Sequence, residues 1–455
     1  MRPDATTLTE DASGRPSLPP TRRLAVTVAW CEARPDLVGA IGFLEPTPRF
    51  LGRAIEPRDG VAPLAFVHQR PGRNEPVRPL DLPAISRVQL LASAPDDERA
   101  VIENRGKCAL LIDGAALDRV ELDEGRTFCL GEQALFLVTT RPEVLPPTAH
   151  WDEPRFPFGA PDPLGLVGES EAAWALRDAV AHAARHADHV LVRGPSGVGK
   201  ELVARGLHAL SARSAGPFVA RNAATIPESL MAAELFGSRS GYPNAGAPER
   251  SGLIGAAHGG TLFLDEIGEL PHTLQAALLR VMDPEGSYQR LGESEVRSAD
   301  LRVVGATNRP LDALKPDLRA RFSLPLEVPS LDDRREDIPL LVRHLVADWQ
   351  TPVSLELVDR LLAHDHALNV RELRTLLVQA RALGRRPLRP PEALTGATPA
   401  RGGSPEEIDE PRLRAALERH EGVVANVWRE LGLKNRYVLR RLLAKHGIDP
   451  ARYRR

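Results

Sequence analysis

Hydrophobic and polar residues follow two different patterns along the chain. From residue 23 to 142, short apolar runs such as LAVTVAW and ALFLV recur about every ten residues between turn residues, and several alternate apolar with polar positions. This pattern is typical of an all-β sandwich. From residue 164, strand-like runs such as HVLVRG and TLFLDE alternate with amphipathic segments of helical length. That alternation predicts βαβ units around a parallel sheet.

Later segments are purely helical or rich in proline. Residues 332–385 carry only helical periodicity and predict a small helical lid on the α/β part. The predicted fold class is therefore multidomain: an all-β sandwich, an α/β subdomain with a helical lid, and a small all-α module. In order, we expect a disordered arm, the sandwich, a linker, the α/β subdomain, the lid, a second linker and the all-α module, at residues 1–22, 23–142, 143–163, 164–331, 332–385, 386–405 and 406–455.

Composition excludes several classes of protein. The 455 residues include 59 Lys and Arg and 61 Asp and Glu, a net charge of −2, which excludes a uniformly basic nucleic-acid coat. Three cysteines exclude a disulfide scaffold and fit a reducing compartment. We found no apolar run of about 18 residues, and the N-terminal residues lack the apolar core of a signal peptide. We therefore expect a cytoplasmic protein without a membrane partner.

The run GPSGVGKE stands between a strand-like segment and a helical segment, as a phosphate-binding loop requires. Glycines let backbone N–H groups point at phosphate oxygens, the helix N-terminus adds partial positive charge, and the lysine reaches the outer phosphates. A glutamate follows the lysine where a hydroxyl residue usually binds Mg²⁺. The expected nucleotide-binding residues here are Gly194, Pro195, Ser196, Gly197, Val198, Gly199, Lys200 and Glu201.

A second motif, TLFLDE, is an apolar strand that ends in two carboxylates. Such a strand end places Asp265 near Mg²⁺, and Glu266 can polarise the attacking water as a general base. Alone, the run also fits a buried strand with a solvated turn. After a phosphate-binding loop, it predicts hydrolysis of a nucleoside triphosphate.

Further motifs occur across residues 164–385, namely FVARNAA, AAELFG, GGTLFLDEIGELP, GATNRPL, DRREDIPLL and NVREL. With GPSGVGKE, and in this order, they resemble the AAA+ P-loop ATPase domain of sigma-54-dependent transcription activators, also called bacterial enhancer-binding proteins. In that family a glutamate follows the loop lysine, which accounts for Glu201. The resemblance implies a bacterial ATPase that uses ATP and Mg²⁺ and acts on sigma-54 RNA polymerase.

The resemblance also implies roles for single residues. Lys200 would bind phosphate, Asp265 would hold Mg²⁺ and Glu266 would activate water. Asn222 resembles the residue that restrains the catalytic glutamate until nucleotide is sensed.

Three more residues match family positions on the sheet and lid. Asn308 resembles the first sensor and Arg371 the second. In KPDLRARF, Arg321 falls where an arginine finger reaches the site of a neighbouring subunit, which implies a homo-oligomeric ring, expected to be a hexamer. Arginine suits this role because it stays charged and binds phosphate at two points. A solvated surface arginine is the alternative for Arg321.

One family motif is altered. The family's GAFTGA loop contacts sigma-54, and the 21 residues between ELFG and GGTLF keep its spacing. Pro243 takes the position of its phenylalanine and Asn244 that of its threonine, while Tyr242 offers an aromatic ring one residue away. The expected sigma-factor loop is Gly241, Tyr242, Pro243, Asn244, Ala245 and Gly246.

The C-terminal residues form a basic helical module. Residues 411–455 hold 12 Lys and Arg against four Asp and Glu, a net charge of +8, and residues 411–447 resemble the Fis-type helix-turn-helix that ends these activators. A small basic dimerisation bundle is the alternative. The resemblance implies binding to upstream DNA through Lys434, Asn435, Arg436, Tyr437 and Arg440.

The N-terminal sandwich carries a weaker pattern. Arg53, the pair Ser86 and Arg87, and the run ENRG resemble a forkhead-associated (FHA) domain, which binds phosphothreonine through loops at one end. Two arginines can clamp a phosphate to which the serine hydroxyl donates. The family's usual histidine is Gln89 here. An inert regulatory sandwich is the alternative.

Three functions are compatible with these sequence features. The first is an activator that couples ATP hydrolysis to sigma-54 RNA polymerase under control of a phosphothreonine protein. The second is a DNA-binding AAA+ regulator that the altered loop has uncoupled from sigma-54. A chaperone-like or helicase-like motor is a third class, which the motifs at 232–271 and the terminal helix-turn-helix disfavour.

Overall fold

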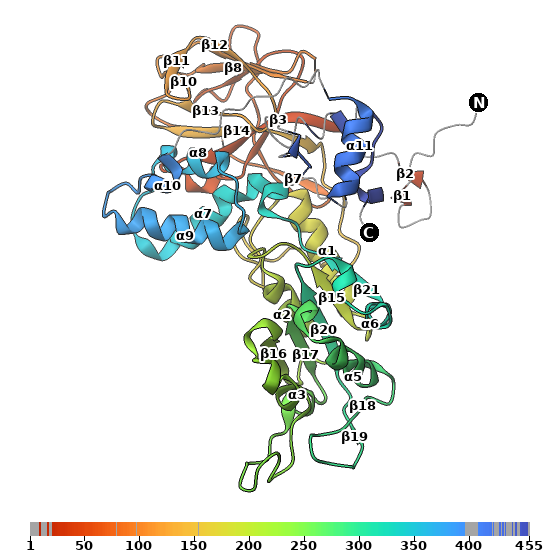
Figure 1. Cartoon of the computed structure of the whole chain (residues 1–455). Helices are drawn as coiled ribbons and strands as arrows, with labels where there is room; N and C mark the ends of the chain where they lie inside the picture. Colours follow the sequence, from red (N-terminus) through yellow and green to blue (C-terminus); the bar gives the residue numbers. More distant parts are fainter. Residues whose placement is uncertain are drawn as a thin grey trace, which may run out of the picture. The chain divides into compact units, whose positions relative to one another are not determined.

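The computed structural model describes most of the chain as two compact units, and each is described by itself. The first consists of the N-terminal residues through Pro146 with later helices, and the second of Pro147–Asp337 with His366–Arg374 (Figure 1). The described residues are 9–10, 16–17, 21–78, 80–96, 98–152, 154–395, 408–420, 422, 427–428, 430–431, 433, 439, 442–443 and 446–453.

The N-terminal residues form two antiparallel sheets, so the predicted β-rich region is confirmed. One sheet has the order β11-β10-β13-β14-β3-β4-β6-β7 and the other β12-β9-β8-β5. Apolar side chains from both sheets share one core. The strands are β3 (Arg22–Trp30), β4 (Ile41–Phe43), β5 (Arg49–Leu51), β6 (Val67–Arg70), β7 (Arg73–Pro76), β8 (Leu90–Ser93), β9 (Ala100–Asn104), β10 (Leu110–Ile112), β11 (Ala115–Leu117), β12 (Arg119–Leu122), β13 (Thr127–Leu130) and β14 (Ala134–Pro142).

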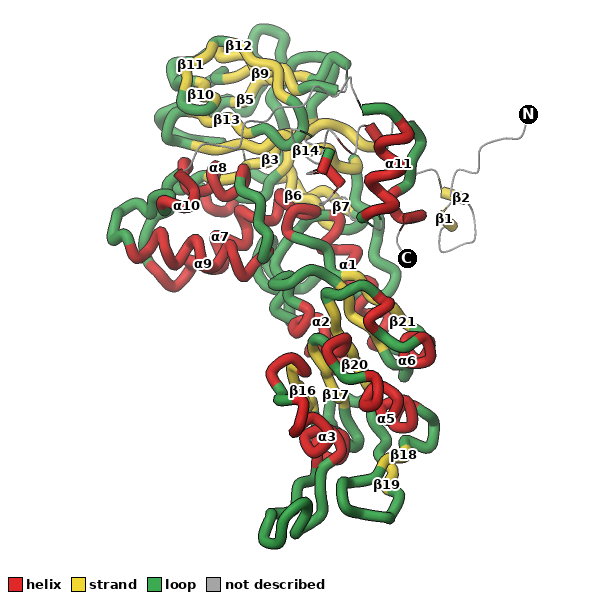
Figure 2. The backbone as a smooth tube through the Cα atoms, in the orientation of Figure 1, coloured by secondary structure: helices red, strands yellow, loops and turns green. Residues whose placement is uncertain are grey.

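The second unit is built on a five-stranded sheet of order β16-β17-β20-β15-β21, in which every pair is parallel. Figure 2 shows helices packed around these strands. The strands are β15 (Val190–Arg193), β16 (Phe218–Asn222), β17 (Thr261–Asp265), β20 (Arg302–Thr307) and β21 (Leu324–Glu327), and the helices are α1 (Glu171–Ala184), α2 (Lys200–Ala209), α3 (Glu228–Phe236), α4 (Gly252–Ala256), α5 (His272–Met282) and α6 (Pro316–Arg321).

The inner strand β17 of this parallel sheet is buried on both faces. Leu262 and Leu264 of β17 join a core with residues of α3 to α6, whereas Phe263 between them joins a core with residues of α1 and α2. Because successive side chains of a strand point to opposite faces, a strand covered on both sides reads as a continuous apolar run. This explains the sequence TLFL.

The remaining described elements are mostly helical. They are α7 (Ile338–Val346), α8 (Leu355–Ala363), α9 (Asn369–Ala382), α10 (Glu392–Thr395) and α11 (Glu410–Arg419), with the short pairs β1 (Thr9–Glu10) with β2 (Pro16–Ser17) and β18 (Ser287–Tyr288) with β19 (Arg297–Ser298). Ser354 caps α8 by accepting a hydrogen bond from Leu357 N–H. Among the described residues, no helix combines the length and apolarity that a membrane span needs.

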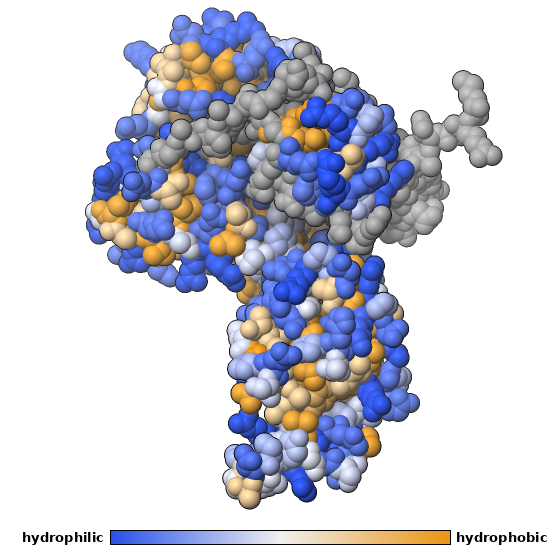
Figure 3. Space-filling model, in the orientation of Figure 1, coloured by the Kyte–Doolittle hydropathy of each residue, from blue (hydrophilic) through white to orange (hydrophobic). Residues whose placement is uncertain are grey.

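Polar residues cover most of the face seen in Figure 3, with apolar residues scattered among them. The predicted disordered arm falls outside the described residues except for 9–10, 16–17 and 21–22. Residues 396–405 of the predicted second linker also fall outside them.

Candidate functional site

The strands of the second unit bring the sequence motifs to one edge of the sheet. The phosphate-loop run follows β15, the Asp-Glu pair ends β17, Asn308 follows β20 and Asn222 ends β16. Because all these strands are parallel, their carboxyl ends meet at the same edge, which is where ligands bind in open α/β sheets.

The loop of residues 194–199 leads directly into α2, whose first residue is Lys200. Gly197 has a φ of +79°, and a Cβ there would lie 2.1 Å from the Leu368 carbonyl oxygen, so only glycine fits. The Lys200 ammonium donates to the carbonyl oxygens of Gly194 at 3.0 Å and Pro195 at 3.3 Å. The loop therefore curls around its own lysine.

Lys200 is held close to the Asp-Glu pair. Its side chain is 7% exposed, and its Nζ lies 3.9 Å from Glu266 Oε1. Burial lowers the pKa of Lys200, and the nearby carboxylates of Glu266 and Asp265 oppose that shift. A buried cation beside two carboxylates is suited to the charge of a triphosphate.

The two carboxylates are held by different partners. Glu266 has a φ of +51°, unusual for a residue with a side chain, and its Oε2 accepts a hydrogen bond from Asn308 N–H at 3.4 Å. Asp265 accepts one from Glu266 N–H at 3.0 Å and one from Asn222 Nδ2 at 3.2 Å. The restraint of Glu266 by Asn222 stays a prediction, and the amide of Asn222 contacts Asp265 in this structure. The reason is register, since Asn222 and Asp265 are directly paired on neighbouring strands.

Two residues at the start of α9 contact the phosphate loop. Arg371 Nη1 donates to Ser196 Oγ at 3.1 Å. Asn369 donates to the Ser196 carbonyl oxygen at 2.9 Å and accepts from Leu331 N–H at 2.7 Å. The role of Asn369 was missed in the sequence; its φ of +53° is a backbone feature that the motif NVREL does not reveal.

A buried carboxylate also escaped sequence analysis. Asp337, within the motif DRREDIPLL, accepts hydrogen bonds from Glu169 N–H, Ser170 N–H and Ser170 Oγ at 2.8, 2.9 and 2.6 Å. Desolvation raises the pKa of Asp337, and the nearby Arg334 opposes that shift. This carboxylate fixes the segment that leads into α1.

Two predicted site residues lie on the surface of this unit. Glu201 pairs with Arg205 one turn along α2, with 2.7 Å between the charged atoms. Arg321, at the end of α6, pairs with Asp283 at 2.5 Å and is 47% exposed. An exposed arginine is compatible with a function toward another molecule, but its own contact is with Asp283.

The altered loop projects from the end of the second unit beside the β18–β19 turn (Figure 1). Residues 242–246 are exposed, and Gly241 N–H donates to the Ala247 carbonyl oxygen at 2.8 Å. The Tyr242 ring packs on Gly292, where a Cβ would come within 2.7 Å of it. Tyr242 as a whole nevertheless remains 38% exposed, so this aromatic residue is accessible near the tip.

In the first unit, the predicted phosphate-binding residues come together. Arg53 N–H donates to the Ser86 carbonyl oxygen at 3.2 Å, and Ser86 Oγ accepts from Lys107 N–H at 3.0 Å. Arg53 and Arg87 are both exposed. Lys107 is a further cation that sequence analysis did not select for this role.

Gln89 organises these loops. The residue is fully buried. Its side-chain oxygen Oε1 accepts hydrogen bonds from Ser86 N–H and Cys108 N–H. Its side-chain nitrogen Nε2 donates to Asn104 Oδ1 and to the Cys108 carbonyl oxygen. A glutamine can satisfy two donors and two acceptors at once, so this departure from the FHA pattern joins the loop before β8 to the connection between β9 and β10.

The predicted DNA-binding residues Lys434, Asn435, Arg436, Tyr437 and Arg440 lie outside the described residues. In the same C-terminal stretch, Leu413, Ala416 and Leu417 of α11 share a core with described apolar residues between 427 and 448.

A glycine-rich loop between β15 and α2, with a lysine, an Asp-Glu pair and a sensor-like arginine around it, defines an AAA+ P-loop ATPase domain. Comparison with known proteins agrees. Residues 166–324 match the protein family described as the Sigma-54 interaction domain, which is an AAA+ P-loop ATPase domain.

Related proteins point to the same family. The chain is 36% identical to the transcriptional regulatory protein ZraR of Escherichia coli over 307 residues, 61% of this chain and 68% of ZraR. It is 41% identical to the phenol regulator MopR of Acinetobacter guillouiae over 234 residues, 48% of this chain but only 42% of MopR. The chain therefore belongs to the family of transcriptional regulators with a sigma-54 interaction domain.

A solved structure is also similar in part. NtrX from Brucella abortus in complex with ATP is 32% identical, with a TM-score of 0.47, over 62% of this chain and 70% of NtrX.

Proposed function

We propose that this chain is an ATP-hydrolysing activator that binds upstream DNA and remodels sigma-54 RNA polymerase. The observation that carries the proposal is the position of Glu266, between the Lys200 ammonium at 3.9 Å and the Asn308 backbone N–H at 3.4 Å. A carboxylate next to the phosphate-binding lysine and a sensor-like residue is placed to respond to the terminal phosphate.

In this proposal, the residues around the phosphate loop each have a role in ATP hydrolysis. Lys200 and the N–H groups at the start of α2 bind the phosphates and offset their charge. Glu266 orients a water molecule and takes its proton as the water oxygen bonds to the terminal phosphorus and the phosphorus–oxygen bond to the leaving ADP breaks. Arg371, which contacts the loop residue Ser196, would change its contacts when nucleotide occupies the loop.

Asp265 is the residue that fits Mg²⁺. Its carboxylate is partly exposed at the strand end and is oriented by Asn222 and Glu266 N–H, and carboxylates with water and phosphate oxygens are the ligands that Mg²⁺ prefers. Bound there, the ion would neutralise charge on the phosphates. Glu201 faces Arg205 instead, so Asp265 is the candidate ligand.

The proposed active form is a ring, expected to be a hexamer. Arg321 would leave Asp283 and reach the nucleotide of the neighbouring subunit, where an arginine can stabilise the transferring phosphoryl group. Its exposure at the end of α6 supports this assignment.

The direct test is hydrolysis by Lys200→Ala. We expect nucleotide binding and phosphate release to fall to background, because the buried ammonium is lost. Arg205→Ala, on the next turn of α2, is the matched control and should retain activity. Normal hydrolysis by a folded Lys200→Ala protein would remove the site assignment.

One observation favours a second candidate, a DNA-binding regulator uncoupled from sigma-54. Pro243 and Asn244 occupy the exposed positions where the family has its contact pair. Reporter transcription that persists in a strain without sigma-54 would support this candidate and defeat the activator.

For the first unit we propose phosphothreonine binding by Arg53, Ser86 and Arg87. The convergence of their loops on Gln89 supports it. Arg87→Ala should lose binding of a phosphothreonine peptide, whereas Arg119→Ala on β12 should not. DNA binding by Lys434, Asn435, Arg436, Tyr437 and Arg440 remains a proposal from the sequence, testable by DNA footprinting.

A further inference from the structure

A cavity of about 420 Å³ lies within the second unit, between the segment 150–164, α1 and the end of α2. Its volume falls in the range of about 300–1,000 Å³ that is usual for small-molecule sites. Most of its wall is apolar, and the apolar residues that matter here are Trp151, Phe156, Leu164, Ala181 and Leu210.

The part of the wall that contains Trp151 is fixed to α1. Asp178 of α1 accepts hydrogen bonds from His150 N–H at 2.6 Å and from Trp151 N–H at 2.9 Å. Arg185 Nη2, directly after α1, donates to the His150 carbonyl oxygen at 2.8 Å. The backbone that carries the Trp151 ring is therefore held in place by side chains of the scaffold.

The second aromatic residue of the wall is also held in place. The Phe156 ring stacks on Trp174 of α1, with 6.0 Å between the ring centroids and 20° between the ring planes. The Arg177 guanidinium lies 5.5 Å from the Phe156 centroid and 4.4 Å from that of Trp174. Arg177 is in turn paired with Asp162 at 2.7 Å, and both side chains are fully buried. The cavity is thus preformed.

The polar residues of the cavity favour an anion. Arg155 and Arg185 line it against one carboxylate, Asp152, which leaves a net charge of +1. Arg155 is exposed, and within the part of the chain that the structure describes no hydrogen bond or ion pair engages its guanidinium. A free guanidinium can bind a carboxylate, sulfonate or phosphate group through two parallel hydrogen bonds.

We propose that this cavity binds a small organic anion that carries an aromatic ring. The ring lies against Trp151 and Phe156, because aromatic side chains bury a large area and prefer stacked or edge-on contacts with other rings. The acidic group of the ligand pairs with Arg155. An apolar, preformed cavity with a few polar groups that fix orientation is the usual form of a small-molecule site.

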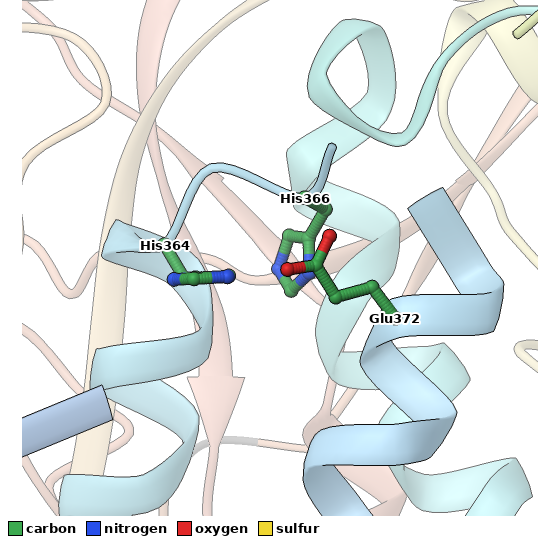
Figure 4. A group of neighbouring side chains, drawn as sticks. All are labelled: His364, His366 and Glu372. Carbon is green, nitrogen blue, oxygen red and sulfur yellow. The ribbon is translucent and has the colours of Figure 1, made fainter. Parts of the chain in front are cut away.

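The cavity is separate from the phosphate site. Lys200 begins α2, whereas Leu210 follows its last residue, and ten residues of helix span about 15 Å. None of the described residues that line the cavity belongs to the phosphate loop or to the first turn of α9, where Figure 4 shows Glu372. Binding in this cavity does not depend on the proposed ATPase, and its test requires no nucleotide.

The experiment titrates the full chain with two fluorescent dyes. The first is anilinonaphthalene sulfonate, an aromatic anion, and the second is phenylnaphthylamine, which has the same rings without the sulfonate. We expect saturable binding of the anionic dye that is tighter than binding of the neutral dye. Arg155→Gln should weaken binding of the anionic dye by roughly tenfold and leave that of the neutral dye unchanged. Leu210→Glu should weaken both, because it places a charge on the apolar wall.

Arg280→Gln on α5 and Leu230→Glu on α3 are the matched controls, since both residues are exposed in the same unit and neither lines the cavity. Both should bind the dyes as the unchanged chain does, and circular dichroism establishes that each variant is folded. Equal affinity for the anionic dye in Arg155→Gln and the unchanged chain, or no preference of the unchanged chain for the anionic dye, would overturn the proposal. The comparison of the two dyes on the unchanged chain gives an independent answer if a variant fails to fold.

Discussion

Arg371 Nη1 lies 3.1 Å from Ser196 Oγ, so the start of α9 contacts the loop that is expected to bind phosphate. The neighbouring Asn369 strengthens this link through its hydrogen bonds to the Ser196 carbonyl oxygen and to Leu331 N–H. Binding of nucleotide in the loop would therefore affect α9 through Asn369 and Arg371, two residues in its first turn.

The first prediction concerns Asn369. Asn369→Ala should lower the free energy of unfolding by about 2–4 kcal/mol, because it removes two hydrogen bonds and places alanine at a positive φ. Asn369→Gly removes the same hydrogen bonds but relieves the backbone strain, so its loss should be smaller. Urea unfolding of both variants separates the two effects. Equal losses of unfolding free energy in the two variants would show that backbone strain at residue 369 does not contribute to the effect of Asn369→Ala.

The second prediction concerns Glu266. Glu266→Gln keeps the size of the side chain but cannot take a proton, so phosphate release should fall by about 10²–10⁴-fold. ATP affinity, measured with a fluorescent analogue, should stay within a few fold. Glu269→Gln, whose carboxylate pairs with Arg309 at 2.5 Å, is the control and should hydrolyse ATP normally. A Glu266→Gln protein with full turnover would exclude Glu266 as the base.

A third prediction concerns pH. His189 Nδ1 accepts a hydrogen bond from Val303 N–H at 3.0 Å, so the folded state needs that nitrogen unprotonated, and Nε2 lies 3.2 Å from the Met282 carbonyl oxygen. Burial lowers the pKa of His189, and the Met282 carbonyl opposes that shift. A lowered folded pKa means that the contribution to stability is complete above the unfolded pKa of about 6.5 and is lost as pH falls through the folded value.

The melting temperature of the second unit should therefore fall more steeply on acidification in the unchanged chain than in His189→Gln. Thermal unfolding at several pH values between about 5 and 8 measures this difference. His272→Gln, at the exposed start of α5, should leave the pH profile unchanged. Identical profiles for His189→Gln and the unchanged chain would contradict the assignment.

Much of the phosphate site was predictable because its residues sit at the ends of parallel strands. An apolar run that ends in Asp265 and Glu266 must bring them to the same edge as the loop after β15. The partners of these residues were harder to foresee. Asn369 and Ser196 are 173 residues apart, and no local pattern pairs them. Asp337 and Ser170 are separated by 167 residues in the same way.

In the N-terminal loops, side-chain contacts could not be predicted from the sequence for a different reason. The sequence identified Gln89 only as a departure from the FHA pattern, because its structural role depends on two segments, residues 86–89 and 104–108, that meet in space. Side-chain hydrogen bonding of this kind cannot be inferred from residue spacing. The Asn222 contact was similarly decided by strand register.

A fourth prediction follows for Gln89. Gln89→Ala should lower the free energy of unfolding of the first unit by about 3 kcal/mol, because it leaves the part-buried backbone groups of Ser86 and Cys108 without their side-chain partner. It should also weaken phosphothreonine-peptide binding, since Ser86 would lose its fixed position. Gln133→Ala, in the turn between β13 and β14, is the control. Unchanged stability and peptide binding in Gln89→Ala would refute this role.

The fifth prediction concerns Tyr242 and the central claim that this ATPase acts on sigma-54. Tyr242→Ala removes the exposed ring beside Pro243 and should abolish contact with sigma-54 while leaving ATP hydrolysis unchanged. Val296→Ala, an exposed apolar residue near β19, is the control and should retain both activities.

The most direct measurement is capture of purified sigma-54 by the full chain in the presence of ADP and aluminium fluoride, a mimic of the transition state. We expect a stable complex with the unchanged chain and with Val296→Ala, and none with Tyr242→Ala. ATP hydrolysis by the unchanged chain without any capture of sigma-54 would contradict the activator and favour a regulator uncoupled from sigma-54.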